Sequence, residues 1–108
     1  MRGGWVYIMA DRYRGAIYIG VTGDLPARVH QHRTGAGSDF CRRYGLDRLV
    51  YADWTENIAN AIAREKAMKR WLRAWKVRAI EDANPAWRDL FDVMLGGAEE
   101  AGPSPSRG

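Results

Sequence analysis

The stretch WVYIMADRYRGAIYIGVT, residues 5–22, decides the fold. Residues 6–10 and 16–21 are rich in Val, Ile and Tyr, and the charged, glycine-containing segment DRYRG lies between them. This pattern is typical of two strands joined by a turn. The sequence therefore predicts an antiparallel β-hairpin at the start of the chain.

Each predicted strand carries one tyrosine among aliphatic residues, Tyr7 in the first and Tyr18 in the second. Because alternate side chains of a strand point to opposite faces, the aliphatic residues share one face and both phenols lie on the other. If the turn is centred between Arg12 and Tyr13, Tyr7 stands directly across from Tyr18. Cross-strand aromatic pairs stabilise hairpins, so the two phenols have an ordinary structural explanation as well as a functional one.

The rest of the chain predicts a helix, a third strand and two further helices. LPARVHQHR follows Asp24, a good N-cap, and is followed by a glycine-rich loop, TGAGSDF. RLVYADW, residues 48–54, predicts a strand. A helix capped by Thr55 comes next, and Pro85 ends a second helical piece over residues 73–83. Apolar residues recur at helical spacing in this region: Ile58, Ala61, Ile62, Met68 and Leu72.

The predicted fold class is α/β, with a small three-stranded antiparallel sheet flanked by helices. The piece AWRDLF, residues 86–91, predicts a short helix or turn that packs back on the core. One folded domain is expected over residues 1–95 of the 108. Residues 96–108, GGAEEAGPSPSRG, have no large apolar side chain, and a flexible tail is expected there.

The composition narrows the functional classes. Cys41 is the only cysteine, which rules out an intrachain disulfide and a cysteine-rich metal site. No apolar run approaches the ~20 residues of a membrane span, and no signal peptide is evident, so a cytoplasmic protein without a membrane partner is expected. The 17 Lys and Arg against 13 Asp and Glu give a net charge of +4. This mild excess fits either a solvated surface or a phosphate-bearing partner.

The basic stretch REKAMKRWLRAWKVR, residues 64–78, has Trp71 and Trp75 among its cations. Cations for phosphates and rings for bases are the parts of a nucleic-acid surface. The two tryptophans are four residues apart, so we assign both rings to the core and leave the cations, including Lys69 and Arg70, on a side that faces solvent or DNA.

Glu65 breaks the apolar pattern of its helix. It lies about 20° from Ile58 on the helical wheel, inside the apolar stripe. A carboxylate there needs a charge partner, a metal ion or a raised pKa. Lys69, four residues on, offers the ordinary explanation of an ion pair, and a metal site is the functional one.

Arg28 and His32 lie on one face of the first predicted helix, four residues apart. Both side chains also suit the edge of a core, where long side chains reach out to water. Arg28 is the better functional candidate of the two, because its planar guanidinium matches phosphate oxygens.

Together these residues resemble the GIY-YIG nuclease family, and within it the small stand-alone bacterial proteins. The motifs are Val6–Ile8 and Tyr18–Gly20, followed by Arg28, His32 and, within AREK, Glu65. The resemblance extends over roughly residues 5–91 and includes NPAW, where Asn84 falls near a polar position of the site. The first motif reads Val-Tyr-Ile where the family name has Gly-Ile-Tyr.

The resemblance implies a metal-dependent endonuclease that hydrolyses DNA phosphodiester bonds, with a role in repair or processing. Glu65 would hold one Mg²⁺ or Mn²⁺ ion, and Arg28 would clamp the phosphate. Tyr7 would take the proton of the attacking water, with Tyr18 or His32 relaying it. Substrate contacts are expected at Gly20, Lys69, Arg70 and Asn84. A non-catalytic nucleic-acid-binding domain and a protein-interaction module are the alternatives, and RNA is the alternative to DNA.

Overall fold

The computed structural model describes residues 3–93. Its element order is β1 (Gly4–Ala10), β2 (Ile17–Thr22), α1 (Leu25–Thr34), α2 (Asp39–Tyr44), β3 (Arg48–Thr55), α3 (Ile58–Lys69) and α4 (Arg73–Ala83). The three strands form one antiparallel sheet in the order β2-β1-β3. The expected α/β fold with a three-stranded sheet flanked by helices is confirmed. The expected tail and the domain end at residue 95 lie outside the described residues.

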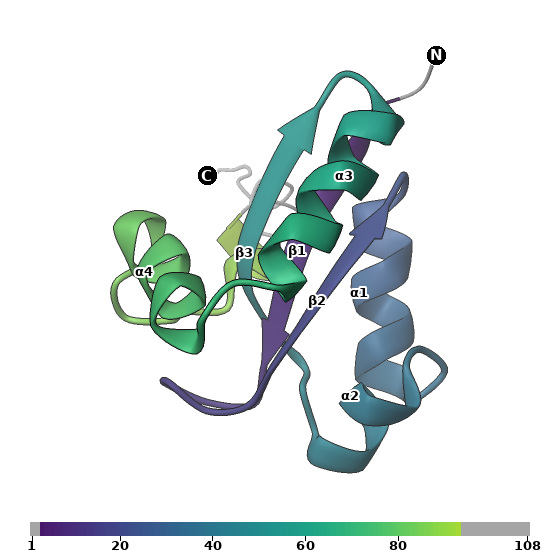
Figure 1. The fold of residues 1–108 in the computed structure, drawn as a ribbon. Coiled ribbons are helices and arrows are strands. Elements are labelled where there is room, and N and C mark those ends of the chain that lie inside the picture. Colours follow the sequence, from purple (N-terminus) through teal and green to yellow (C-terminus); the bar gives the residue numbers. More distant parts are fainter. Residues whose placement is uncertain (1–2, 94–108) are drawn as a thin grey trace, which may run out of the picture.

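The helices cover both faces of the sheet (Figure 1). Val6, Ile8 and Ile19 pack with residues of α3 and α4 in one core cluster. Tyr7 and Met9 pack with α1 and α2 in the other. Because β1 is the central strand and both its faces are covered, every side chain from Val6 to Ala10 is fully buried. The predicted division of aliphatic and phenolic faces is therefore confirmed.

The register of the hairpin differs from the prediction by two residues. Tyr7 pairs with Gly20, and Tyr18 pairs with Met9. The reason lies in the turn, where the Asp11 carboxylate accepts a hydrogen bond from the Ala16 amide at 2.8 Å and Arg14 adopts φ 55°. A shift by an even number of residues keeps each side chain on its face, so the two phenols stay on one side as diagonal neighbours.

Several local expectations about the helices were right and others were wrong. Asp24 caps α1 by accepting a hydrogen bond from the Ala27 amide at 3.2 Å. The expected loop over residues 34–40 was wrong at its end, because α2 begins at residue 39 with Ser38 as its N-cap. The cap of α3 is Asn57 rather than Thr55. Ile62 and Leu72, expected in the apolar stripe, are 39% and 66% exposed.

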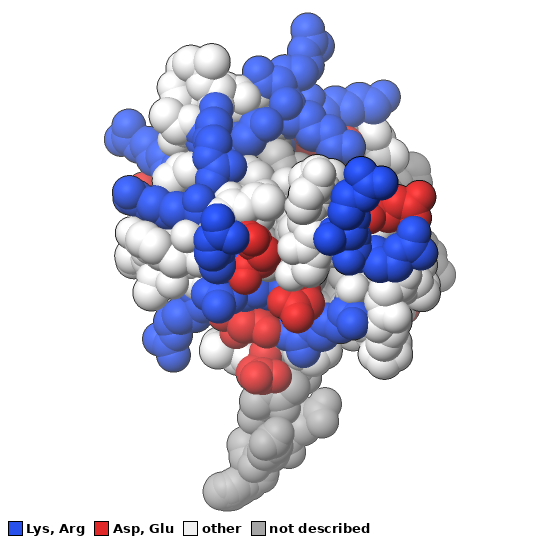
Figure 2. All heavy atoms as spheres, turned by 90° about the horizontal axis from the view of Figure 1, so that it is seen from below, with Lys and Arg blue, Asp and Glu red and all other residues white. Residues whose placement is uncertain are grey.

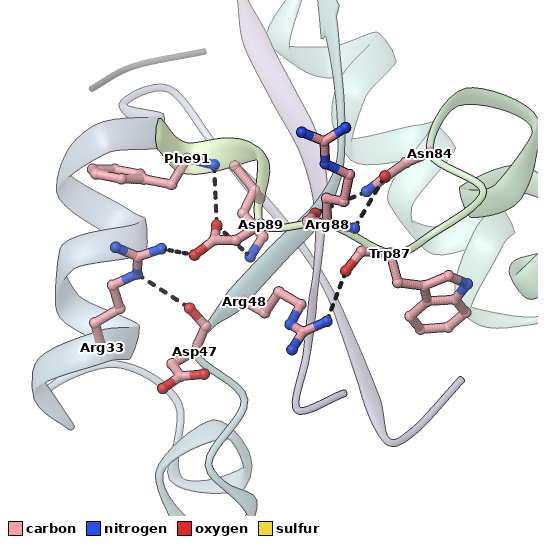
Figure 3. A network of polar contacts seen from close by, with 9 residues as sticks. Arg33, Asp47, Arg48, Asn84, Trp87, Arg88, Asp89 and Phe91 are labelled. Atoms are coloured by element: carbon pink, nitrogen blue, oxygen red, sulfur yellow. Dashed lines mark hydrogen bonds and ion pairs between the residues drawn. The ribbon is translucent and has the colours of Figure 1, made fainter. Parts of the chain in front are cut away.

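The segment after α4 covers the outer edge of β3 (Figure 3). The Asn84 side-chain amide donates to the Val50 carbonyl at 3.1 Å, and the Asp89 carboxylate accepts from the Leu49 amide at 3.3 Å. Arg33 of α1 pairs with Asp89. Trp87, Leu90 and Phe91 pack against the two core clusters, as expected for this segment.

Candidate active site

The rings of Tyr7, Tyr18 and His32 form one cluster on the α1 side of the sheet. The ring centroids are 6.4 Å apart for the two tyrosines, 5.6 Å for Tyr7 and His32, and 5.4 Å for Tyr18 and His32. The Tyr7 hydroxyl lies 2.8 Å from His32 Nε2 and is hydrogen-bonded to it. The strand alternation and the helical spacing together bring about this meeting of β1, β2 and α1.

Gly20 makes room for the Tyr7 ring. A Cβ atom built on Gly20 would lie 2.5 Å from the Tyr7 hydroxyl and 2.6 Å from its Cζ. These distances are far below van der Waals contact, so the glycine is required by the phenol that lies across from it. We had expected Gly20 to admit substrate; the side chain that approaches it in the structure is Tyr7.

Burial raises the pKa of Tyr7, and the neighbouring Tyr18 raises it further, while Arg28 lowers it only in part. The phenol is completely shielded from solvent. Arg28 alone therefore does not offset the effect of burial, and the Tyr7 phenol keeps its proton near neutral pH. Tyr18 is only partly buried, and it is the phenol of the cluster that reaches the surface.

His32 is held as a neutral imidazole. Burial lowers its pKa, and the positive charge of Arg28 lowers it further. Its Nδ1 atom is buried without a hydrogen-bond partner, and a Cβ on Gly37 would lie 2.7 Å from that atom. The loop after α1 thus covers Nδ1, and Nε2 is the ring nitrogen that is hydrogen-bonded to Tyr7.

Glu65 lies on the other side of the sheet. Its helix, α3, packs on the face that carries Val6 and Ile8, not on the face of the two phenols. The apolar stripe that contains Glu65 therefore packs on the face of the sheet opposite to the two phenols. α1 and α3, the helices that carry Arg28 and Glu65, lie on opposite faces of the sheet (Figure 1), and β2 is one of its two edge strands.

Glu65 is 8% exposed, and its carboxylate forms an ion pair with Lys69, with 2.6 Å between Oε2 and Nζ. Within residues 3–93 no group of three or more His, Cys, Asp or Glu side chains gathers into a metal site. A single carboxylate still fits a magnesium ion, because Mg²⁺ keeps several waters and takes one or two carboxylates with substrate phosphate. The donor set is thus sufficient for one hydrated ion that substrate completes.

The remaining expected contacts separate in space. Lys69 and Arg70 are exposed at the end of α3. Asn84 is buried against β3, the strand at the opposite edge from β2. Its side-chain nitrogen donates to two backbone carbonyls, and its side-chain oxygen accepts from a backbone amide. The structure therefore does not bring Asn84 to the cluster of Tyr7, Tyr18, Arg28 and His32.

Charge is mixed on the surface near the hairpin turn. Figure 2 shows the face seen from below in Figure 1, where Lys and Arg side chains spread widely and acidic side chains lie among them. No helix of the described segment is long and apolar enough to span a bilayer. The mild positive charge of the chain is thus not gathered into one uniform patch on this face.

The sequence matches the GIY-YIG catalytic domain over residues 3–78. The chain belongs to the GIY-YIG family. It is 31% identical over 90 residues to a UPF0213 protein of Pectobacterium carotovorum, covering 83% of this chain and 90% of that protein. It is 33% identical over 76 residues to a UPF0213 protein of Clostridium perfringens, covering 70% of this chain and 81% of that one. No solved structure matches this chain. The GIY-YIG family is a nuclease family whose members typically use divalent metal ions.

Proposed function

We propose that this GIY-YIG protein is a metal-dependent endonuclease that hydrolyses phosphodiester bonds in DNA, in repair or processing. The observation that carries the proposal is the buried Tyr7–His32 hydrogen bond at 2.8 Å, with Tyr18 against both rings and Arg28 one helical turn from His32. A purely structural hairpin needs neither a buried histidine nor a cation beside it.

The chain's own residues divide the work. Arg28 binds the scissile phosphate and offsets the negative charge that grows on it during attack by water. Tyr18, the partly exposed phenol, orients the attacking water. Tyr7 relays the proton of the attacking water through its 2.8 Å hydrogen bond to Nε2 of His32, which is neutral because its pKa is lowered. Glu65 would hold one Mg²⁺ or Mn²⁺ ion, which when bound supplies positive charge for the leaving oxygen.

The test compares Glu65→Gln with Glu56→Gln, a matched change at an exposed glutamate. We expect Glu65→Gln to abolish cleavage of a panel of branched, single-stranded and duplex DNA in Mg²⁺ or Mn²⁺, while thermal stability and gel-shift binding in EDTA persist. Glu56→Gln should cleave as the unchanged protein does. Metal-dependent cleavage that survives Glu65→Gln would overturn the metal-ligand assignment.

One observation favours a second candidate, a non-catalytic nucleic-acid-binding domain. Lys69 already neutralises the carboxylate that the ion would need. This second function would be favoured if the protein binds the panel in EDTA but cleaves none of its members in Mg²⁺ or Mn²⁺. The protein for the cleavage assay must first be freed of EDTA. The absence of both binding and cleavage would favour a protein-interaction module.

A further inference from the structure

A second surface with nucleic-acid chemistry lies away from the tyrosine cluster, on the α3 and α4 side of the sheet. A surface groove there is lined by aromatic and charged side chains from β3, α3, α4 and the link between these helices: Tyr51, Arg64, Trp71, Trp75, Arg78 and Asp82. The sequence assigned both tryptophan rings to the core. Trp71 is partly buried against the core, but Trp75 is 58% exposed, so that expectation was wrong for Trp75.

The exposed wall of the groove is one stripe of α4. Trp75, Arg78 and Asp82 follow one another at spacings of three and four residues, which places them on one face of the helix. The Trp75 ring is 58% exposed, so it is open to a ligand that stacks on it. The stripe therefore offers a flat apolar ring with a guanidinium one turn away.

The opposite wall carries Arg64, held in place from three sides. Its guanidinium carbon lies 5.5 Å from the centre of the Trp71 ring. Its Nη2 atom lies 3.5 Å from the Tyr51 hydroxyl, and its Nε atom 3.6 Å from an Asp53 carboxylate oxygen. The side chain is still 42% exposed, so it retains donors for an incoming anion.

We propose that this groove binds an unpaired nucleotide of the substrate strand, with the base stacked on Trp75 and its phosphate held by Arg64 and Arg78. The proposal rests on the proposed function, because it takes nucleic acid as the substrate. An exposed ring between two guanidinium groups matches a base and its phosphate, since every base has a π face and base stacking tolerates any sequence. A paired base is already stacked within the duplex and cannot lie on the ring.

The position of the groove relative to the site supports this assignment. Arg64 directly precedes Glu65 in α3, so the two side chains diverge by about 100° around a helix that is ~10–12 Å wide. A strand whose scissile phosphate lies near Glu65 thus reaches the groove by passing around α3. The groove would then select substrates that have unpaired nucleotides close to the cleaved bond.

The test measures binding without cleavage, in full-length protein carrying Glu65→Gln and in EDTA. The probes are a fluorescein-labelled single-stranded DNA of mixed sequence and the same strand annealed to its complement, followed by fluorescence anisotropy. We expect Trp75→Ala to weaken single-strand binding roughly 5- to 100-fold and duplex binding less than about twofold. Trp75→Phe, which keeps a stacking ring, should bind within about threefold of the parent.

Trp54→Ala is the matched control, because Trp54 is 47% exposed and lies outside the groove. It should leave both affinities unchanged. Equal single-strand affinity in Trp75→Ala and its parent would overturn the proposal, as would an equal loss for both probes. Dissociation of a dimer by Trp75→Ala in sedimentation velocity, with unchanged single-strand binding, would also overturn it and make the groove a contact between copies. None of these results depends on catalysis, so failure of the proposed nuclease activity is detected separately.

Discussion

The Tyr7 hydroxyl and His32 Nε2 lie 2.8 Å apart, and both side chains are buried. Their burial has opposite effects on their charged forms. It raises the pKa of Tyr7 and lowers the pKa of His32, so both groups are neutral near pH 7. The neutral phenol and the neutral imidazole form one buried hydrogen bond. Its effect on stability can be measured without any substrate.

The first consequence concerns acid. The pKa of His32 is lower in the folded protein than its ordinary value of ~6.5. As the pH falls below ~6.5, the unfolded chain therefore binds a proton at His32 more readily than the folded chain does. The stability from His32 is therefore complete above about pH 6.5 and is lost as pH falls below it. Urea unfolding between pH 5 and 7.5 should show this decline, and His32→Asn should flatten it. A slope that is unchanged in His32→Asn would contradict the prediction.

The second prediction concerns Gly20. An alanine there would place its Cβ 2.5 Å from the Tyr7 hydroxyl, inside a strand pair that cannot easily move. We expect Gly20→Ala to destabilise the protein by about 1–3 kcal/mol in urea unfolding, as overpacked cores do. Gly23→Ala is the control, because the nearest atom to its added Cβ is 3.9 Å away, and it should change stability by less than about 0.5 kcal/mol. Equal effects of the two changes would argue against the close fit.

The third prediction separates two roles for Asn84. Its amide makes three hydrogen bonds to backbone groups of Val50 and Arg88, so Asn84→Ala leaves buried polar groups unpaired. We expect a loss of about 2–3 kcal/mol in the free energy of unfolding. At a temperature where the variant remains folded, its DNA affinity in EDTA should match that of the unchanged protein. Full stability with weakened DNA binding would instead support the substrate contact expected from the sequence.

The fourth prediction concerns the ion pair that holds Glu65. The 2.6 Å contact with Lys69 competes with any cation for the same carboxylate oxygen. Lys69→Gln should therefore raise the affinity for Mn²⁺, measured by electron paramagnetic resonance, by roughly two- to fivefold, since such half-exposed pairs are worth up to ~1 kcal/mol. Lys66→Gln, a change at an exposed lysine on the same helix, should have no effect. Weaker Mn²⁺ binding in Lys69→Gln would mean that the lysine helps to position the carboxylate.

The sequence was most informative where local chemistry decides the structure. Asp24 caps α1 with its own side chain, and Pro85 ends the helical piece over residues 73–83; both predictions were confirmed. The short helix α2 was missed, although Ser38 and Gly45 mark its ends, because six residues give too little periodicity to detect.

The site was predictable in its residues and less so in its arrangement. Alternation placed Tyr7 and Tyr18 on one face, and helical spacing joined Arg28 to His32. The side of the sheet on which α3 packs is a tertiary choice, so the separation of Glu65 from the phenols was not visible in the pattern. The exposure of Trp75 was missed for the same reason, since the spacing of two tryptophans does not say which one the core accepts.

The segment after α4 also determines how this small sheet meets other chains. Asn84 and Asp89 occupy backbone groups of Val50 and Leu49 along the outer side of β3, much as a neighbouring strand would. A foreign strand cannot pair with these two groups, and covering part of a sheet edge in this way disfavours edge-to-edge aggregation. The other edge strand is β2, and the helices that carry Arg28 and Glu65 cover opposite faces of the sheet beside it. The β2 edge, beside the candidate active site, is thus the edge that the segment after α4 leaves open. Asn84 helps to cover the β3 edge.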